Sequence, residues 1–217
     1  MDPEAIPPEP KPVDIERLKN YLAGRITVID LRPTERFVQG HIPGSINIPS
    51  NNPELVVRLM YLLHPGAPVL FLADDPGEAQ EVAQMVHQTR RNPVVGWYEG
   101  TFEEWQAAGG QVEPFPTVDL ATFRQALHDE EWVVVDVREP MEWTSTGVVP
   151  GSLLVPLREV HRHITELPER ARIAVICAAG GRATIAASLL RAHGLDACAV
   201  FPGGVPHLPP DDREPPS

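Results

Sequence analysis

Residues 174–187 read Ala-Val-Ile-Cys-Ala-Ala-Gly-Gly-Arg-Ala-Thr-Ile-Ala-Ala. The apolar start of this stretch predicts a buried strand, and its Ala-rich end predicts a helix. A tight loop from Cys177 to Arg182 joins the two. Backbone N–H groups and the helix dipole favour an anion at a helix N-terminus, so Cys177 is expected to be a nucleophilic thiolate. The stretch therefore predicts a strand–loop–helix unit with a reactive thiol at the end of the strand.

The length and charge of the chain limit its domain organisation and its partners. Its 217 residues are enough for one large domain or two of roughly 100 residues each. It carries 18 Lys and Arg against 30 Asp and Glu, a formal net charge of −12. This balance argues against nucleic acid as the main partner, because binding to phosphate backbones needs clustered basic residues.

Targeting segments and metal sites are not visible in the sequence. No apolar run approaches the roughly 18 residues of a membrane span, and residues 1–8 lack the basic and apolar parts of a signal peptide. The two cysteines, Cys177 and Cys198, are too few for a disulfide framework, which favours a reducing cytoplasm. We expect no membrane partner, no metal and no other cofactor.

The second half of the chain repeats the first. A β-branched run that ends in Asp-x-Arg occurs at residues 26–32 and again at 132–138, and Pro-Gly-Ser occurs at 43–45 and 150–152. In both halves, further apolar runs alternate with helical patterns, which predicts a mainly parallel sheet flanked by helices. A repeat of this length indicates duplicated domains rather than a solenoid. The fold class is therefore α/β with two tandem domains, and ligands are expected beyond the carboxyl ends of the strands.

Composition also marks the boundaries of these domains. Gly and Pro breakers favour a linker between the halves, and the Pro-rich, acidic ends favour disorder. We predict a disordered N-terminal tail, a first domain, a linker, a second domain and a disordered C-terminal tail, at residues 1–12, 13–108, 109–116, 117–206 and 207–217. Asp14 is placed to cap a helix that runs to residue 23.

The motifs of both halves resemble those of the rhodanese family of sulfurtransferases. The matching features are Asp-x-Arg after the first strand, Gly-His-Ile-Pro-Gly-Ser at 40–45, Cys-x-x-Gly-x-Arg at 177–182 and Gly-Gly at 203–204. The resemblance covers residues 12–108 and 116–206. It implies two tandem rhodanese-like domains and an activity like that of a thiosulfate sulfurtransferase.

Alignment of one half on the other distinguishes the two domains. The equivalent positions are Ala73 for Cys177, Pro76 for Gly180 and Glu78 for Arg182. The first domain thus lacks the thiol and carries a carboxylate where the second has a guanidinium. Because two-domain members of the family commonly contain an inactive domain, the first domain is predicted to be catalytically silent.

The resemblance implies covalent chemistry at Cys177. Its thiolate would take the sulfane sulfur of a donor as a persulfide and pass it to a thiol, cyanide or a protein acceptor. Backbone N–H groups of the loop would surround the sulfur, with glycines supplying positive φ angles. The guanidinium of Arg182 would bind a small anionic donor such as thiosulfate. The predicted anion-binding loop comprises Ala178, Ala179, Gly180, Gly181 and Arg182.

Other interpretations of this loop stay open. Cys177 could be an inert buried cysteine, although neither glycines nor an arginine are needed to cap a core. Four residues separate Cys177 from Arg182, as in sulfurtransferase loops, whereas related phosphatases and arsenate reductases carry five. The small, uncharged Ala178 and Ala179 also suit a non-enzymatic carrier that delivers a persulfide to a protein partner. The loop resembles neither thiosulfate-specialised nor 3-mercaptopyruvate enzymes, so the donor remains open.

Structural roles are expected for other conspicuous residues. Cys198, within an apolar run, is predicted to be a small buried hydrophobe, with a resolving cysteine as the alternative. Asp136 with Arg138, and Asp30 with Arg32, are predicted to brace the strand ends through ion pairs rather than to carry chemistry.

Overall fold

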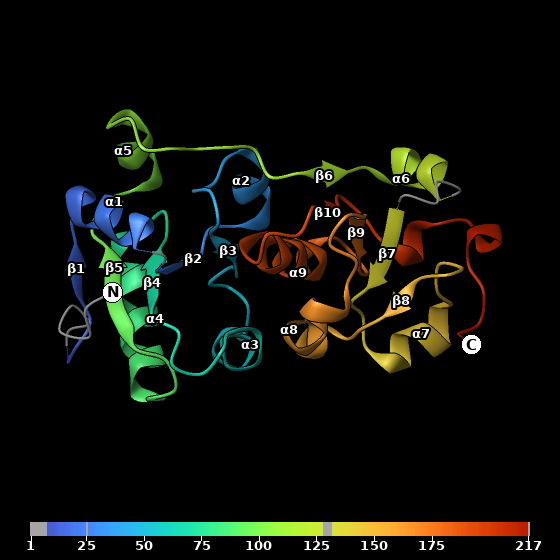
Figure 1. The fold of residues 1–217 in the computed structure, drawn as a ribbon, viewed down its shortest axis with the longest axis horizontal. Coiled ribbons are helices and arrows are strands. Elements are labelled where there is room, and N and C mark those ends of the chain that lie inside the picture. Colours follow the sequence, from blue (N-terminus) through green and yellow to red (C-terminus); the bar gives the residue numbers. More distant parts are fainter. Residues whose placement is uncertain (1–7, 25, 128–131, 217) are drawn as a thin grey trace. The chain divides into compact units, whose positions relative to one another are not determined.

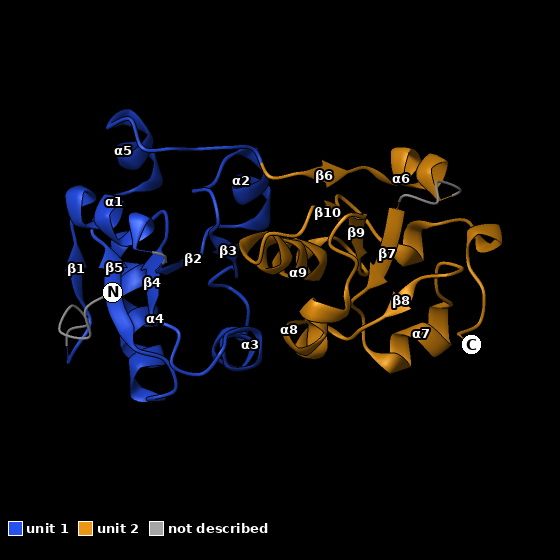
Figure 2. Cartoon of the chain, viewed as in Figure 1, with its two compact units in different colours: residues 1–114 blue, residues 115–217 orange. Residues whose placement is uncertain are grey.

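The chain divides into two compact units, residues 1–114 and 115–217 (Figure 2). The computed structural model describes residues 8–24, 26–127 and 132–216. The boundary between the units falls within residues 109–116, the predicted linker. Part of that segment is tied to the first unit, because the indole N–H of Trp105 donates to the carbonyl of Gln111 at 3.0 Å.

The first unit is a five-stranded parallel sheet in the order β1-β5-β4-β2-β3, flanked by helices (Figure 1). Its strands are β1 (Lys11–Val13), β2 (Thr27–Asp30), β3 (Ile46–Asn47), β4 (Val69–Leu72) and β5 (Val94–Tyr98). Its helices are α1 (Ile15–Ala23), α2 (Thr34–Gln39), α3 (Leu55–Leu62), α4 (Pro76–Gln88) and α5 (Phe102–Ala107). Asp14 caps α1 as predicted, its Oδ1 accepting from the backbone N–H of Arg17 at 2.8 Å.

The second unit repeats this architecture, with a five-stranded parallel sheet in the order β6-β10-β9-β7-β8. Its strands are β6 (Thr117–Val118), β7 (Trp132–Asp136), β8 (Leu153–Leu154), β9 (Arg172–Ile176) and β10 (Ala197–Val200). Its helices are α6 (Leu120–Ala126), α7 (Pro140–Thr146), α8 (Val160–His163) and α9 (Gly181–Ala192), with short 3₁₀ turns at Leu157–Glu159, Ile164–Glu166, Val205–His207 and Pro210–Asp212. The predicted α/β class with two tandem, helix-flanked parallel sheets is confirmed.

The Asp-x-Arg pairs lie buried at the ends of β2 and β7, as predicted. Nη2 of Arg138 donates to Oδ2 of Asp136 at 2.6 Å and to the carbonyl of Gly147, which follows α7, at 2.7 Å. In the first unit Nη2 of Arg32 makes the same two kinds of bond, to Asp30 and to the carbonyl after α2. Each arginine therefore ties a strand end to the end of the helix that follows it.

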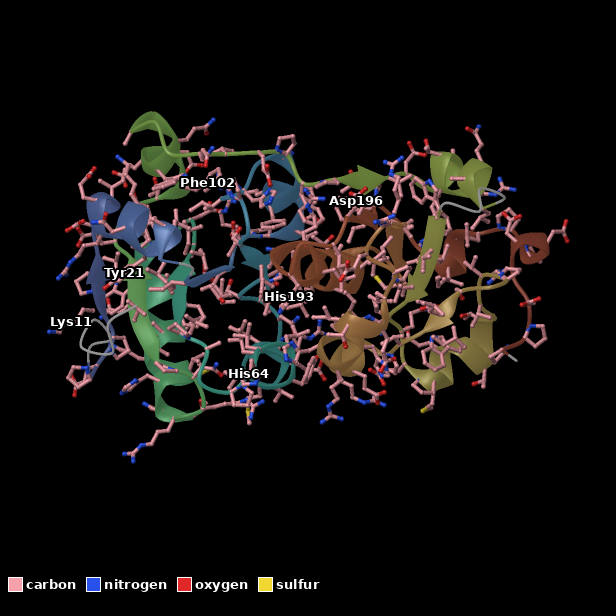
Figure 3. The ribbon with its side chains drawn as sticks, viewed as in Figure 1. Lys11, Tyr21, His64, Phe102, His193 and Asp196 are labelled. Carbon is pink, nitrogen blue, oxygen red and sulfur yellow. The ribbon has the colours of Figure 1, made fainter. Side chains whose placement is uncertain are left out.

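The first unit adds an aromatic contact to its buried arginine. The guanidinium carbon of Arg32 lies 3.4 Å from the centre of the ring of Phe102, which Figure 3 labels beside α5. Phe102 and Trp105 also belong to the core of this unit, together with apolar side chains of α1 and the sheet. Helix α5 thus closes the first unit over its buried ion pair.

Both predicted tails are more ordered than expected where the structure describes them. Residues 1–7 lie outside the described part, but Lys11 and Pro12 form β1, parallel to β5. At the other end, Glu214 pairs with Val148 in an antiparallel bridge, and Asp212 forms an ion pair with Arg124. Contacts with a neighbouring strand or loop supply backbone partners to these Pro-rich segments, which composition alone does not indicate.

Candidate active site

Strand β9 and helix α9 position the candidate nucleophile. Residues 173–176 are buried in the middle of the sheet, between β7 and β10, and Cys177 follows them directly. The sequence then turns into α9, whose Ala-rich surface packs against β9 and β10. Cys177 therefore lies at the carboxyl end of a central parallel strand, where α/β proteins bind ligands.

The thiol sulfur of Cys177 faces the first turn of α9. Backbone N–H groups of Gly180 and Ala183 donate to its Sγ, at 3.1 Å and 3.4 Å. Only 1% of the cysteine surface is exposed. Helix N-terminal N–H groups aimed at a sulfur favour its anionic form, and they would equally favour the outer sulfur of a persulfide anion.

Two glycines give the loop its shape. Gly180 has a φ of +98°, and a Cβ there would lie 2.5 Å from Cδ2 of Phe201. Gly204 packs its Cα against the loop backbone, since a Cβ would lie 2.0 Å from the carbonyl oxygen of Cys177. The next residue, Val205, donates its N–H to that same oxygen at 2.9 Å. The Gly-Gly pair after β10 thus lets the chain come close enough to hold the loop in place.

Arg182 is engaged by a carboxylate from α7. Its Nη1 and Nη2 donate to Oε2 and Oε1 of Glu142, each at 2.6 Å. The two side chains are 22% and 33% exposed. Arg182, which was expected to bind an anionic donor, is thus paired with a carboxylate of the same unit.

The ion pair fixes the charge state of both partners. The hydrogen bonds from Arg182 hold the pKa of Glu142 below its ordinary value, despite partial burial. Glu142 in turn raises the pKa of Arg182, and the charge of Cys177 adds to that effect. Glu142 is therefore ionised at neutral pH, and the loop carries a neutralised cation.

The other predicted loop residues occupy different positions. Ala178 is half-buried and Ala179 is exposed, so they form the outer side of the loop. Gly181 is the first residue of α9 and does not use the positive φ that was predicted for the loop glycines. Ala183, whose N–H does reach the sulfur, was not among the predicted residues.

Glu142 was also missed, although two sequence signals point to it. Pro140 at the first helical position and a glutamate two residues later are typical of a helix start, and Glu142 accepts from the N–H of Glu139 at 2.9 Å. In the repeat, Glu142 and Arg182 align with Arg36 and Glu78, so both positions change sign between the domains.

The equivalent loop of the first unit holds no thiol. Ala73 follows β4, and Arg36 of α2 forms ion pairs with Asp74, at 2.8 Å, and with Glu103. Burial raises the pKa of Asp74, and Arg36 opposes that effect. The cation here comes from the helix and the carboxylate from the loop, the reverse of the second unit. The loop therefore has no thiol on which a persulfide could form.

Cys198 lies in β10, opposite Ala174 of β9, and packs against the core of the second unit. Burial raises the pKa of its thiol to about 11. It therefore behaves as a protonated, largely buried thiol at neutral pH, which agrees with the predicted small hydrophobe.

The residues that the structure describes contain no group of three or more His, Cys, Asp or Glu side chains suited to a metal ion. Among these same residues, no helix combines the length and the apolar composition that crossing a bilayer requires.

The chain thus has two α/β units, and the second places a cysteine at the end of a central strand, in front of a helix N-terminus. The sequence model of the Rhodanese-like domain matches residues 14–108 and 119–207, and the chain belongs to this family as a tandem-domain member. Over 80 residues it is 35% identical to a Bacillus subtilis protein named "Putative sulfur carrier protein YrkF", a match that covers 36% of this chain and 43% of that protein.

Solved structures are also similar. A thiosulfate sulfurtransferase from Pseudomonas aeruginosa aligns at 21% identity over 88% of this chain and 41% of that chain, with a TM-score of 0.40. A rhodanese-related protein from Thermoplasma volcanium aligns at 29% identity over 41% of this chain and 86% of that chain, with a TM-score of 0.38. The chain spans less than half the length of the Bacillus and Pseudomonas proteins.

Proposed function

We propose that this protein is a sulfurtransferase that carries sulfane sulfur as a persulfide on Cys177. The Cys177 thiolate attacks the outer sulfur of a donor, the donor S–S bond breaks, and its electron pair leaves with the remainder of the donor. A thiophilic acceptor, such as a thiol, cyanide or a protein, then attacks the outer sulfur of the persulfide and regenerates the thiolate. The donor is a small sulfane compound, of which thiosulfate is the simplest to assay.

The observation that carries this proposal is the position of the Cys177 sulfur. It lies at the end of a central strand and accepts from the N–H groups of Gly180 and Ala183. An inert cysteine in a protein core needs neither of these hydrogen-bond donors. The first domain, with Ala73 at the equivalent position, has a supporting role in this proposal.

A sulfur carrier is the second candidate function. Ala178 and Ala179 offer no polar or charged side chain that could hold a small substrate. In addition, a relative of this chain bears the name of a sulfur carrier. In this case the persulfide forms but is released only to a protein acceptor. Both candidates need a reduced thiol, and both cysteines are free, which supports a cytoplasmic location.

Steady-state turnover separates the candidates. The protein is incubated with a sulfane donor and cyanide, and thiocyanate is measured beside the Cys177→Ser variant. Repeated formation of thiocyanate by the wild type, but not by Cys177→Ser, supports the enzyme. A persulfide that loads on Cys177 without turnover supports the carrier. Robust hydrolysis of a phosphate ester through Cys177 would instead revive the phosphatase interpretation.

A further inference from the structure

Arg182 is the one basic residue between Cys177 and the first turn of α9. Each of its two terminal nitrogens donates to one oxygen of Glu142, so the bidentate face of the guanidinium is occupied by a carboxylate. The carboxylate is fixed in turn, since its Oε2 also accepts from the N–H of Glu139. The bidentate pair is therefore held from two sides and is not a casual surface contact.

Among the described residues, three other arginines contact α7 or its N-cap, and two of them have carboxylate partners. Arg138 is buried and bonded to Asp136. Arg158 forms an ion pair with Glu139. The third, Arg213, donates to the carbonyl of Thr146, the last residue of α7, at 3.1 Å.

This charge arrangement suits some sulfur donors and opposes others. Thiosulfate brings two negative charges to a site that already holds the Cys177 thiolate and the ionised Glu142. To take the bidentate position on Arg182, a sulfonate would have to displace the carboxylate of Glu142. Like charges brought together without screening oppose binding. A thiol persulfide (R–S–SH) carries at most one negative charge, on its outer sulfur, and has no sulfonate, so it needs only the backbone donors at the sulfur.

We propose that Glu142, by occupying Arg182, makes this site selective for thiol persulfides over thiosulfate. This inference rests on the proposed persulfide chemistry at Cys177 and names the class of donor. The thiolate attacks the outer sulfur of R–S–SH, a Cys177 Sγ–S bond forms, and the donor S–S bond breaks. The thiolate R–S⁻ leaves with the electron pair, and the proton stays on the transferred sulfur. Glu142 is a positioning residue in this scheme because it acts through Arg182.

The test compares two donors in single-turnover loading of Cys177, followed by intact-protein mass. The donors are thiosulfate and the persulfide of 2-mercaptoethanol, which has no other charged group. The Glu142→Gln variant keeps the helix start, since glutamine serves equally in a capping box. It should load from thiosulfate about tenfold faster than the wild type, with the persulfide rate within about twofold.

Two further variants separate selectivity from structure. Glu166→Gln removes the same charge from an exposed site in the same unit, and should change neither rate. The double variant Glu142→Gln/Arg182→Gln should not load faster from thiosulfate than the wild type, because the guanidinium that Glu142→Gln frees is absent.

Each possible result is informative. Equal changes with both donors in Glu142→Gln, or no change with thiosulfate, would overturn the proposed selectivity while leaving the persulfide chemistry intact. Loading of the wild type from neither donor would instead refute the proposed function itself.

Discussion

The backbone N–H of Gly180 donates to Sγ of Cys177 at 3.1 Å, and Gly180 reaches this position with a φ of +98°. The turn of the loop and the hydrogen bond to the sulfur therefore depend on the same residue. Gly181, the next residue, begins α9 with ordinary helical geometry and has open space where a Cβ would stand. The structure therefore has room for a side chain at position 181 but not at position 180.

Replacing Gly180 by Ala should destabilise the second unit, whereas replacing Gly181 by Ala should not. The first change places a Cβ in the left-handed region, which costs about 1–2 kcal/mol, and against Phe201. The second adds a methyl group in open space at a helix start. Urea unfolding of both variants measures the difference. Equal stability of the two variants would contradict this account of the loop.

The buried Asp136–Arg138 pair should be essential to the second unit. Asp136→Ala leaves the guanidinium of Arg138 buried without its partner, which costs about 3–5 kcal/mol. Glu166→Ala removes one member of an exposed pair and serves as the control, with a cost below about 1 kcal/mol. Thermal unfolding distinguishes the two. A loss for Asp136→Ala no larger than that of the control would show that the pair is dispensable.

The Glu142–Arg182 pair should contribute to stability in a pH-dependent way. Because the folded protein holds the pKa of Glu142 below its ordinary value of 4.5, the contribution is complete above that pH and is lost as the pH falls through the lower, folded value. At neutral pH, Glu142→Gln should cost about 1 kcal/mol or less, since both side chains are partly exposed.

The measurement is the stability difference between the wild type and Glu142→Gln across pH 7 to about 3. The difference should shrink as the pH falls below 4.5. A difference that is constant over this range would show that the ion pair does not contribute through its charge.

Cys198 should be chemically silent. With a pKa raised to about 11 by burial, its thiol is protonated near pH 8, so iodoacetamide should modify it slowly in the folded protein. Cys198→Ala should leave sulfur loading and turnover within about twofold of the wild type, because a small buried hydrophobe replaces another. A disulfide between the two cysteines after loading, or loss of turnover in the variant, would favour the resolving cysteine.

Much of this fold is readable from the sequence because local signals agree with it. The β-branched runs before Asp30 and Asp136 form the interior strands β2 and β7, and the Asp14 cap starts α1 as the pattern indicates. Strands β1 and β6 escape prediction, since each has only two or three residues and exists through pairing with β5 or β10. Such short edge strands leave no periodic pattern in the sequence.

The candidate site is less predictable than the fold. Residues 177–180 turn from β9 into α9, and Gly181 and Arg182 begin the helix, as the motif indicates, because a strand end and a helix start are local features. The partner of Arg182 comes from Glu142, which is forty residues away in the chain, and this pairing depends on the packing of α7 against the loop. The motif alone indicates an anion-binding arginine and carries no signal for its partner on α7.

The direct test of the central claim is the mass of the intact protein after incubation with a persulfide donor, read together with peptide mapping. The account predicts the gain of one sulfur on Cys177, its loss on addition of cyanide or a thiol, and no gain in Cys177→Ser. No added sulfur on the wild type, or sulfur found on Cys198 instead, would contradict it.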